Sequence, residues 1–374
     1  MKILIAPDKF KGCLTAEEVT EAIVEGLHAV DPSIEVIPFP LADGGDGTAQ
    51  ILTKHMNGRM VEAVVHDPLL RSINATYGIS GDGLSAFIEM SAASGLRLLT
   101  EEERDCTLTT SLGTGELIRD AIHRGARKIL LGIGGSATND AGIGMASALG
   151  YSFADKNGTH LEPVGKNLVR IAGIDDSNLF FFLEEIEVTV ACDVENPLYG
   201  ENGAAYVYAP QKGANPEQVK DLDNGLRNFA EVVDSKYNRD INTFPGAGAA
   251  GGMGAGAMIF LNAKLVNGIK MVMDQTNFAE QVNRADVIIT GEGRMDDQTF
   301  KGKVVDGVCR QASSRNKKVI AICGQVRLEK EALKNQPLSH CFSIEDHAGE
   351  VNLDPEVTRK NIIELINRYS MKII

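Results

Sequence analysis

The chain has 374 residues, of which 43% are hydrophobic and 24% charged, and its net charge is −14. A chain of this length predicts two domains rather than one oversized core. The negative charge argues against a nucleic-acid-binding protein, because contacts to phosphates need a basic surface. No window approaches the roughly 18 consecutive apolar residues of a membrane helix, so we expect no membrane partner.

The amino terminus, MKILIAPDKFKG, has a short apolar run followed by charge. A secretory signal has a longer apolar centre, so we expect a cytoplasmic protein. The cysteines form no CxxC pair and have no closely spaced histidine that would suggest zinc. We therefore expect reduced, mostly buried thiols at Cys13, Cys106, Cys192, Cys309, Cys323 and Cys341.

The first 57 residues contain two consecutive strand–loop–helix patterns. Residues 2–6 and 34–39 are apolar runs that predict strands. Thr15 and Glu18 form a capping-box pattern at the start of the first helix, and the second helix is expected from about Gly47 to before Gly58. Two such units in succession favour a parallel sheet.

The pattern changes between residues 60 and 90, where short alternating runs predict antiparallel strands. Near the end of the chain, apolar runs again alternate with helical patterns, and strands are predicted at 286–290, 318–322 and 340–344. We predict an α/β protein in which a flavodoxin-like, doubly wound parallel sheet is interrupted by an inserted α/β domain with mixed or antiparallel strands. The predicted domains are 1–57 with 275–374 and 58–274, with the active site in the cleft between them.

Three loops that follow predicted strands combine glycines with carboxylates, and two of them also carry cations. Glycines let backbone N–H groups approach phosphate oxygens, cations neutralise developing charge, and carboxylates hold Mg²⁺ or orient a hydroxyl. Loops at the carboxyl ends of parallel strands converge on one edge of the sheet. The candidate residues of these loops are Asp8, Lys9 and Lys11; Asp43, Gly44, Gly45 and Asp46; and Gly291, Glu292, Arg294 and Asp296.

A further glycine-rich turn follows the apolar run KILL. The pattern from Gly132 to Ala137 fits a dinucleotide-binding turn, and Asp155 lies at the distance expected of a ribose-binding acid. The pattern falls within the inserted segment, however, and its polar residues suit phosphate or metal-bound water better than a pyrophosphate. The candidates here are Gly134, Gly135, Ser136, Asn139 and Asp140.

Several well-known enzyme signatures do not occur in the sequence. There is no Walker A lysine motif, no protein-kinase signature, no GxSxG and no HExxH. Serine hydrolase and zinc hydrolase functions are therefore not favoured.

Taken together, the motifs resemble those of the type I glycerate kinase family over nearly the whole chain. The segments that carry the resemblance include APDKFKG at 6–12, PLADGGDGT at 40–48, IEMSAASGL at 88–96, GIGGSATNDAGIGM at 132–145, ACDVENPLYG at 191–200, PQKGA at 210–214 and TGEGRMDDQTFKGK at 290–303. The resemblance implies phosphorylation of D-glycerate that depends on ATP and Mg²⁺, with 2-phosphoglycerate as the product.

The side chains suggest roles within that reaction. Lys11 and Arg294 are candidates to neutralise the transferred phosphate or to bind the glycerate carboxylate. Asp193 and Asp296 are candidates to coordinate Mg²⁺ or to orient the hydroxyl, and these four residues form the predicted catalytic set. Lys212, within PQKGA, is a candidate for contact with the nucleotide.

The sequence departs from the family pattern at several positions. Lys9 replaces a common Ser, Asp46 a common Glu, and Leu70 and Ala141 each replace a common Gly. Two other functions remain open: an NAD(P)-dependent oxidoreductase that uses the Gly132–Ala137 turn, and a non-catalytic sensor of sugar acids or nucleotides. The glycine-rich stretch 245–258 is interpreted either as a hinge or as a substrate loop.

Overall fold

A computed structural model describes residues 1–180, 183–349 and 353–373. The chain folds into two compact units, and we describe each by itself. Unit 1 consists of Met1–Asp43 and Gly268–Ile374, and unit 2 consists of Gly44–Asn267. Both divisions lie earlier in the chain than the predicted domain boundaries, so residues 44–57 group with the inserted segment.

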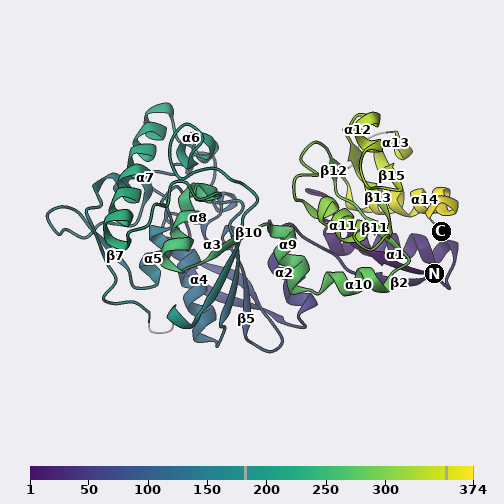
Figure 1. The fold of residues 1–374 in the computed structure, drawn as a ribbon, viewed down its shortest axis with the longest axis horizontal. Coiled ribbons are helices and arrows are strands. Elements are labelled where there is room, and N and C mark those ends of the chain that lie inside the picture. The colour runs from purple at the N-terminus through teal and green to yellow at the C-terminus, as the bar shows by residue number, and fades with distance from the viewer. Residues whose placement is uncertain (181–182, 350–352, 374) are drawn as a thin grey trace. The chain divides into compact units, whose positions relative to one another are not determined.

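Unit 1 contains a five-stranded, entirely parallel sheet, visible in Figure 1. Its order is β15-β13-β11-β1-β2, which is the flavodoxin order 2-1-3-4-5 when the strands are counted along the chain within the unit. The sheet confirms the predicted fold class and all five predicted strands. These are β1 (Lys2–Ile5), β2 (Glu35–Pro38), β11 (Val287–Thr290), β13 (Lys318–Cys323) and β15 (His340–Ser343).

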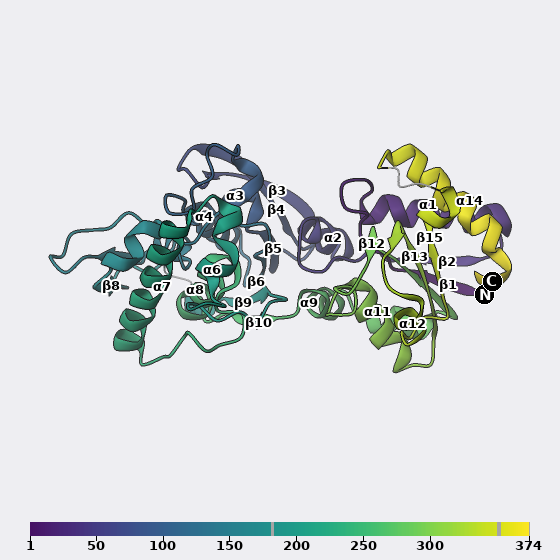
Figure 2. The same cartoon turned by 90° about the horizontal axis from the view of Figure 1, so that it is seen from above.

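Helices cover both faces of this sheet. Figure 2 shows α1 (Ala16–Val30) and α14 (Pro355–Ile373) on one face and α11 (Val304–Ser313) on the other. The predicted capping box is present, since Thr15 and Glu18 each accept a backbone N–H of the other. Alternate strand residues, such as Ile3 and Ile5, pack with Leu27 of α1 in one buried apolar cluster. The remaining elements are α9 (Gly268–Gln275), α10 (Phe278–Arg284), α12 (Lys330–Lys334), α13 (Ile344–Ala348) and the short parallel pair β12 (Arg294–Met295) and β14 (Gln325–Val326).

Unit 2 is built on a six-stranded mixed sheet of order β10-β9-β6-β5-β4-β3. Strands β3 and β4 are antiparallel, as are β4 and β5, which confirms the antiparallel strands predicted from the alternation between residues 60 and 90. The other pairs are parallel. The strands are β3 (Arg59–His66), β4 (Ser72–Ile79), β5 (Ser85–Glu89), β6 (Lys128–Gly132), β9 (Glu187–Ala191) and β10 (Lys264–Val266), and a separate antiparallel pair is formed by β7 (Ser152–Ala154) and β8 (Gly173–Asp175).

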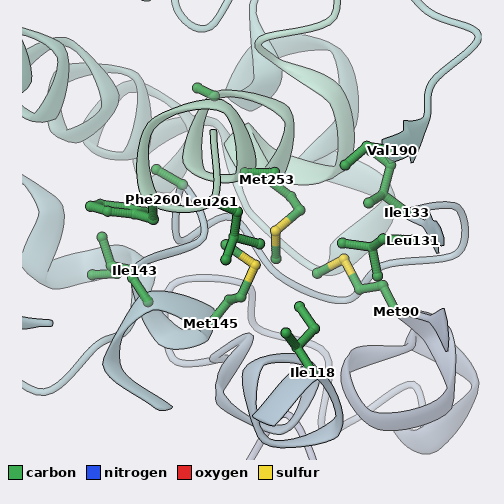
Figure 3. Close-up of a cluster of buried hydrophobic side chains, with 14 of the residues drawn as sticks. Met90, Ile118, Leu131, Ile133, Ile143, Met145, Val190, Met253, Phe260 and Leu261 are labelled. Carbon is green, nitrogen blue, oxygen red and sulfur yellow. The ribbon is translucent and has the colours of Figure 1, made fainter. Parts of the chain in front are cut away.

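The core of unit 2 lies between this sheet and its helices. Figure 3 shows Leu131 and Val190 from the sheet turned toward Met90, Met145 and Met253, all of them buried. Flexible methionines fill gaps between elements of different geometry. The helices are α2 (Thr48–His55), α3 (Ser91–Ser94), α4 (Leu112–His123), α5 (Ile143–Ala148), α6 (Ala204–Tyr208), α7 (Pro216–Tyr237) and α8 (Ala249–Phe260).

The glycine-rich stretch 245–258 leads into α8 and forms most of it, with a kink at residues 250–252, and is largely buried inside unit 2. Its backbone packs directly on the loop after β6. A Cβ atom at Gly251 would lie 2.1 Å from the carbonyl oxygen of Thr138, and one at Gly256 would lie 2.3 Å from that of Ala141. The glycines therefore serve close backbone packing within one unit.

Two positions at which the resemblance led us to expect glycine, Leu70 and Ala141, adopt the left-handed backbone conformation. Leu70 has φ +62° and Ala141 has φ +51°. Residues with a Cβ are strained in this region, so both departures from the family pattern carry a conformational cost.

Candidate functional site

Three carboxylates of unit 1 lie where its central strands end. Asp8 follows β1, Asp43 follows β2 and Glu292 follows β11. The loops are connected through the backbone, because the N–H of Asp8 donates to the carbonyl of Gly291 (2.8 Å) and that of Leu41 donates to Pro7 (3.0 Å). We call Asp8, Asp43 and Glu292 the carboxylate cluster. It brings together residues that the sequence predicted from three separate loops.

Burial and nearby negative charge raise the pKa of two members of this cluster, Asp8 and Glu292. Burial, followed by the negative charge of Asp43, raises the pKa of Asp8 to about 7. Burial also raises the pKa of Glu292 to about 7, with Asp296 and Asp43 contributing, although a hydrogen bond with Thr299 opposes the shift. The buried Oε1 atom of Glu292 has no hydrogen-bond partner among the described residues. An unpartnered carboxylate oxygen is costly, so this atom is suited to hold a ligand or a cation.

The predicted cations of unit 1 lie on its surface. Lys11 and Arg294 are exposed, whereas Lys9 is half-buried. Nε of Arg294 is 3.4 Å from a carboxylate oxygen of Asp296. The other Asp296 oxygen accepts the N–H of Gln298 (2.9 Å), so this carboxylate is partly used within its own loop.

In unit 2, the glycine-rich turn after β6 is held by the segment after β5. The N–H of Leu96 donates to the carbonyl of Gly135 and that of Ala137 donates to Ser94, both at 2.9 Å. Gly134 and Gly135 remain exposed. The predicted Gly44–Asp46 loop lies against the end of β6, because a Cβ atom at Gly132 would lie 2.6 Å from the Gly44 carbonyl oxygen. Two predicted loops thus meet within this unit.

Two side chains that the sequence analysis did not single out position the Gly44–Asp46 loop. Glu89 accepts the N–H groups of Gly47 and Ala49, both at 2.9 Å, and so anchors the start of α2. Ser91 donates to a carboxylate oxygen of Asp46 (3.3 Å). Burial, with Asp46 nearby, raises the pKa of Glu89. Both residues lie in the motif IEMSAASGL, which was the sequence signal that could have identified them.

Lys212 is buried, with 3% of its surface exposed, behind the glycine-rich turn. Its Nζ atom donates to Oγ of Ser136 (2.8 Å) and to the carbonyl oxygen of Thr138 (2.7 Å). Burial lowers the pKa of this lysine to about 8. Lys212 is therefore shielded from solvent, and its contact with the nucleotide stays a prediction.

Asp140 and Asn139 lie deeper in unit 2. The Asp140 carboxylate is fully buried and accepts the N–H and the hydroxyl of Ser111, together with the N–H groups of Gly142 and Gly144. It anchors the start of α5 to the start of α4. The Asn139 side chain is also buried, but neither of its polar atoms has a partner within the described ranges.

Asp193 lies after β9 in unit 2 and is exposed, whereas Asp296 belongs to unit 1. One Asp193 oxygen accepts Nδ2 of Asn267 at 2.6 Å. Over the part of the chain that the structure describes, no three His, Cys, Asp or Glu residues form a group that could hold a metal ion. The assignment of Asp193 and Asp296 as metal ligands stays a prediction.

Asp155, the predicted ribose-binding acid, is used within its own turn. Its Oδ1 atom accepts the N–H groups of Asn157 (2.9 Å) and Thr159 (3.0 Å). The turn after β6 also leads into α5 only at Ile143, rather than directly into a helix. These observations do not favour a dinucleotide-binding turn.

Comparison with known proteins assigns this arrangement to a family. The model of the "Glycerate kinase family" matches residues 3–372. The chain belongs to the glycerate kinase family. It is 44% identical to the "Glycerate 2-kinase" of Escherichia coli over 94% of this chain and 92% of that protein, and 45% identical to the "Glycerate kinase" of Haemophilus influenzae over 94% and 93%.

A solved structure agrees with this assignment. The crystal structure of a putative glycerate kinase 2 from Salmonella typhimurium LT2 matches with a TM-score of 0.87 and 42% identity over 99% of both chains. The protein is therefore an enzyme of the glycerate kinase family, a phosphotransferase, and a kinase family implies ATP as co-substrate. Within the described ranges, no helix is both long and apolar enough to cross a lipid bilayer.

Proposed function

We propose that this enzyme transfers the γ-phosphoryl group of ATP to the 2-hydroxyl of D-glycerate, giving 2-phosphoglycerate, with the assistance of Mg²⁺. The observation that carries the proposal is the carboxylate cluster with its unpartnered Glu292 oxygen, in a chain that belongs to the glycerate kinase family. The similarity to a protein named glycerate 2-kinase supports the position of transfer.

The carboxylate cluster fits a magnesium ion that arrives with the nucleotide. Mg²⁺ is commonly held by one or two carboxylates together with substrate phosphates and water, rather than by a cage made entirely of protein. Among the described residues, no three His, Cys, Asp or Glu side chains form a metal-binding group by themselves, so substrate phosphates and water would have to complete the coordination. When bound, the ion would neutralise charge on the phosphate oxygens. Asp8, Asp43 and Glu292 are the candidates to hold it, with Asp193 and Asp296 as the further predicted ligands.

The same residues offer the other parts of a phosphoryl-transfer site. A carboxylate with a pKa near 7, such as Asp8 or Glu292, is matched to accept the proton that the substrate hydroxyl loses. Lys11 and Arg294, both exposed, are available to contact phosphate or carboxylate oxygens. That the residues of both units share one cleft stays a prediction.

The test is an assay of the purified protein with MgATP and D-glycerate. We expect ADP release together with a product that enolase converts directly to phosphoenolpyruvate, as it does 2-phosphoglycerate but not 3-phosphoglycerate. ADP release with a product that needs a mutase before enolase would overturn the position of transfer. Absence of ADP release would overturn the kinase proposal, and a change in nicotinamide absorbance would instead favour the oxidoreductase.

A further inference from the structure

Lys212 is a buried cation whose hydrogen-bond partners among the described residues are both neutral. Its two hydrogen bonds go to the Ser136 hydroxyl and to a backbone carbonyl. The titratable groups that influence it are Cys106 and Asp140, and neither is bonded to it. The Asp140 carboxylate is already held by four donors. A buried charge without an ionic partner is unfavourable for folding. Stability therefore does not explain why a lysine occupies position 212.

The hydrogen bond from Lys212 determines that the Ser136 hydroxyl can act as a donor toward a ligand. A serine hydroxyl has one proton to donate, and an ammonium group can only donate. Because Nζ of Lys212 donates to Oγ, the Ser136 proton must point toward a different acceptor. No acceptor for it occurs among the described residues. Ser136 is 7% exposed and is followed outward by the exposed Gly135 and Gly134.

The backbone of the turn also presents hydrogen-bond donors that have no acceptor among the described residues. Gly134 and Gly135 form a hydrogen-bonded turn, and their own N–H groups donate to no other group within the described ranges, although the carbonyl of Gly135 and the N–H of Ala137 are both bonded. Gly135 has φ +70°, the left-handed conformation found in turns whose successive N–H groups form an anion-binding concavity. The turn therefore offers several donors that have no acceptor in the part of the chain that the structure describes.

We infer that Lys212 is a positioning residue that holds the Ser136 hydroxyl as a donor to an anionic oxygen bound at the Gly134–Ser136 turn. The inference rests on the proposed function for the source of that oxygen, which is either a phosphoryl group of ATP or the carboxylate of D-glycerate. The ligand touches Ser136 and the turn, whereas Lys212 acts from behind them. Lys212 thus affects binding without contacting the substrate.

The test measures the binding of ATP and of D-glycerate, each alone, by isothermal titration calorimetry. Wild type is compared with Ser136→Ala, Lys212→Met and the double variant. We expect each single variant to weaken binding of the same ligand by roughly 10- to 100-fold, the effect of losing a hydrogen bond to a charged group. The double variant should bind the ligand no more weakly than the single variant with the lower affinity. Both substitutions remove the same interaction, so their effects should not add.

Matched controls come from the same unit. Lys236→Met removes a lysine that donates to a carbonyl and to Asp176, and Ser147→Ala removes a hydroxyl that donates to the Ile143 carbonyl. Neither should change binding of either ligand. The melting temperature of Lys212→Met should not fall below that of wild type, since an unpaired buried charge is removed. If that variant does not fold, Ser136→Ala and Ser136→Thr replace it, and only Ser136→Thr should retain binding.

The outcomes separate the two possible sources of the oxygen. A loss confined to ATP identifies a phosphoryl oxygen, and a loss confined to D-glycerate identifies the carboxylate. Unchanged binding of both ligands to Ser136→Ala, or strictly additive effects in the double variant, would overturn the inference. Because binding is measured without turnover, a wild type that binds its ligands but releases no 2-phosphoglycerate would reject only the proposed function.

Discussion

Asp8 and Glu292 keep their protons to a higher pH in the folded protein than in the unfolded chain. Their pKa values rise from ordinary acid values of 3.8 and 4.5 to about 7. Between these limits the native state binds more protons than the unfolded state, so their contribution to stability falls as the pH rises. Above about pH 7, Asp8 and Glu292 are ionised in both the folded and the unfolded state. Their unfavourable contribution to the free energy of folding is then constant.

We therefore expect Glu292→Gln to stabilise the protein at pH 8 while it abolishes most activity. A gain of about 1 kcal/mol would raise the melting temperature by about 1–2 °C, given the unfolding entropy of a chain of 374 residues. The gain should shrink at pH 5, where the native carboxyl is already neutral. Differential scanning calorimetry at both pH values measures this, and Glu329→Gln, a substitution well outside the cluster, serves as the control. A gain that is equal at both pH values would contradict the assignment.

Leu70 provides a second test at the scale of one residue. Its left-handed conformation suits glycine, and its side chain is 39% exposed. Leu70→Gly should relieve strain of about 1–2 kcal/mol and lose about 0.5–1 kcal/mol to the greater freedom of the unfolded chain. We expect a net gain of roughly 0.5–1 kcal/mol in chemical denaturation. Leu70→Ala, which keeps a Cβ, should bring no such gain.

Sequence reasoning found the residues that follow strands and missed those that act across the fold. Asp8, Asp43 and Glu292 were predictable because parallel strands end at one edge of a sheet. The pairing of Lys212 with Ser136 joins residues that are 76 positions apart, and no local pattern encodes it. Asp140 was assigned to ligand binding by its motif, and that role stays a prediction; its carboxylate joins the starts of α4 and α5, a contact that no local pattern indicated.

At the scale of elements, α8 combines helical turns with a kink, because Ala250, Gly251 and Gly252 have non-helical backbone angles within it. Glycine has a low helix propensity, so the stretch 245–258 suggested a hinge or a loop. The structure instead uses its small residues to bring two backbones together, since Gly251, Gly252 and Gly256 approach the loop that ends at Gly142. The capping-box pattern of Thr15 and Glu18, by contrast, correctly located the start of the regular helix α1.

Gly256→Ala tests this packing. The added Cβ would lie 2.3 Å from the Ala141 carbonyl oxygen, a backbone atom that cannot turn aside as a flexible side chain can. We expect a loss of stability of about 1–3 kcal/mol, the usual range for overpacking. Gly173→Ala is the control, because a Cβ atom at that position would have no described neighbour within 4 Å. Equal melting temperatures for the two variants would contradict close packing of α8.

At the scale of the whole molecule, the main chain passes between the two units only at Asp43–Gly44 and Asn267–Gly268. The first passage falls within the motif PLADGGDGT. Asp43 belongs to the carboxylate cluster of unit 1, and Gly44 begins the loop that lies on β6 in unit 2. One family motif therefore supplies residues to both units.

An insertion at each passage tests whether this continuity matters. We expect about six Gly/Ser residues between Asp43 and Gly44 to leave both units folded, because flexible linkers impose little strain. The catalytic rate should nevertheless fall by at least about tenfold, since near-attack geometry is sensitive to small displacements. The same insertion between Asn267 and Gly268 is the control. Circular dichroism monitors folding, and unchanged activity at the first position would contradict the expectation.

The peptide bond between Asp43 and Gly44 fixes the distance between these two residues, however the domains are arranged. The Cα atoms of Asp43 and Gly44 stay about 3.8 Å apart in every conformation. The Asp43 carboxylate of unit 1 and the Gly44–Asp46 loop of unit 2 are thus joined through a single peptide bond. An insertion at this junction would lengthen the covalent link between them, whereas a substitution elsewhere in either unit leaves that link unchanged.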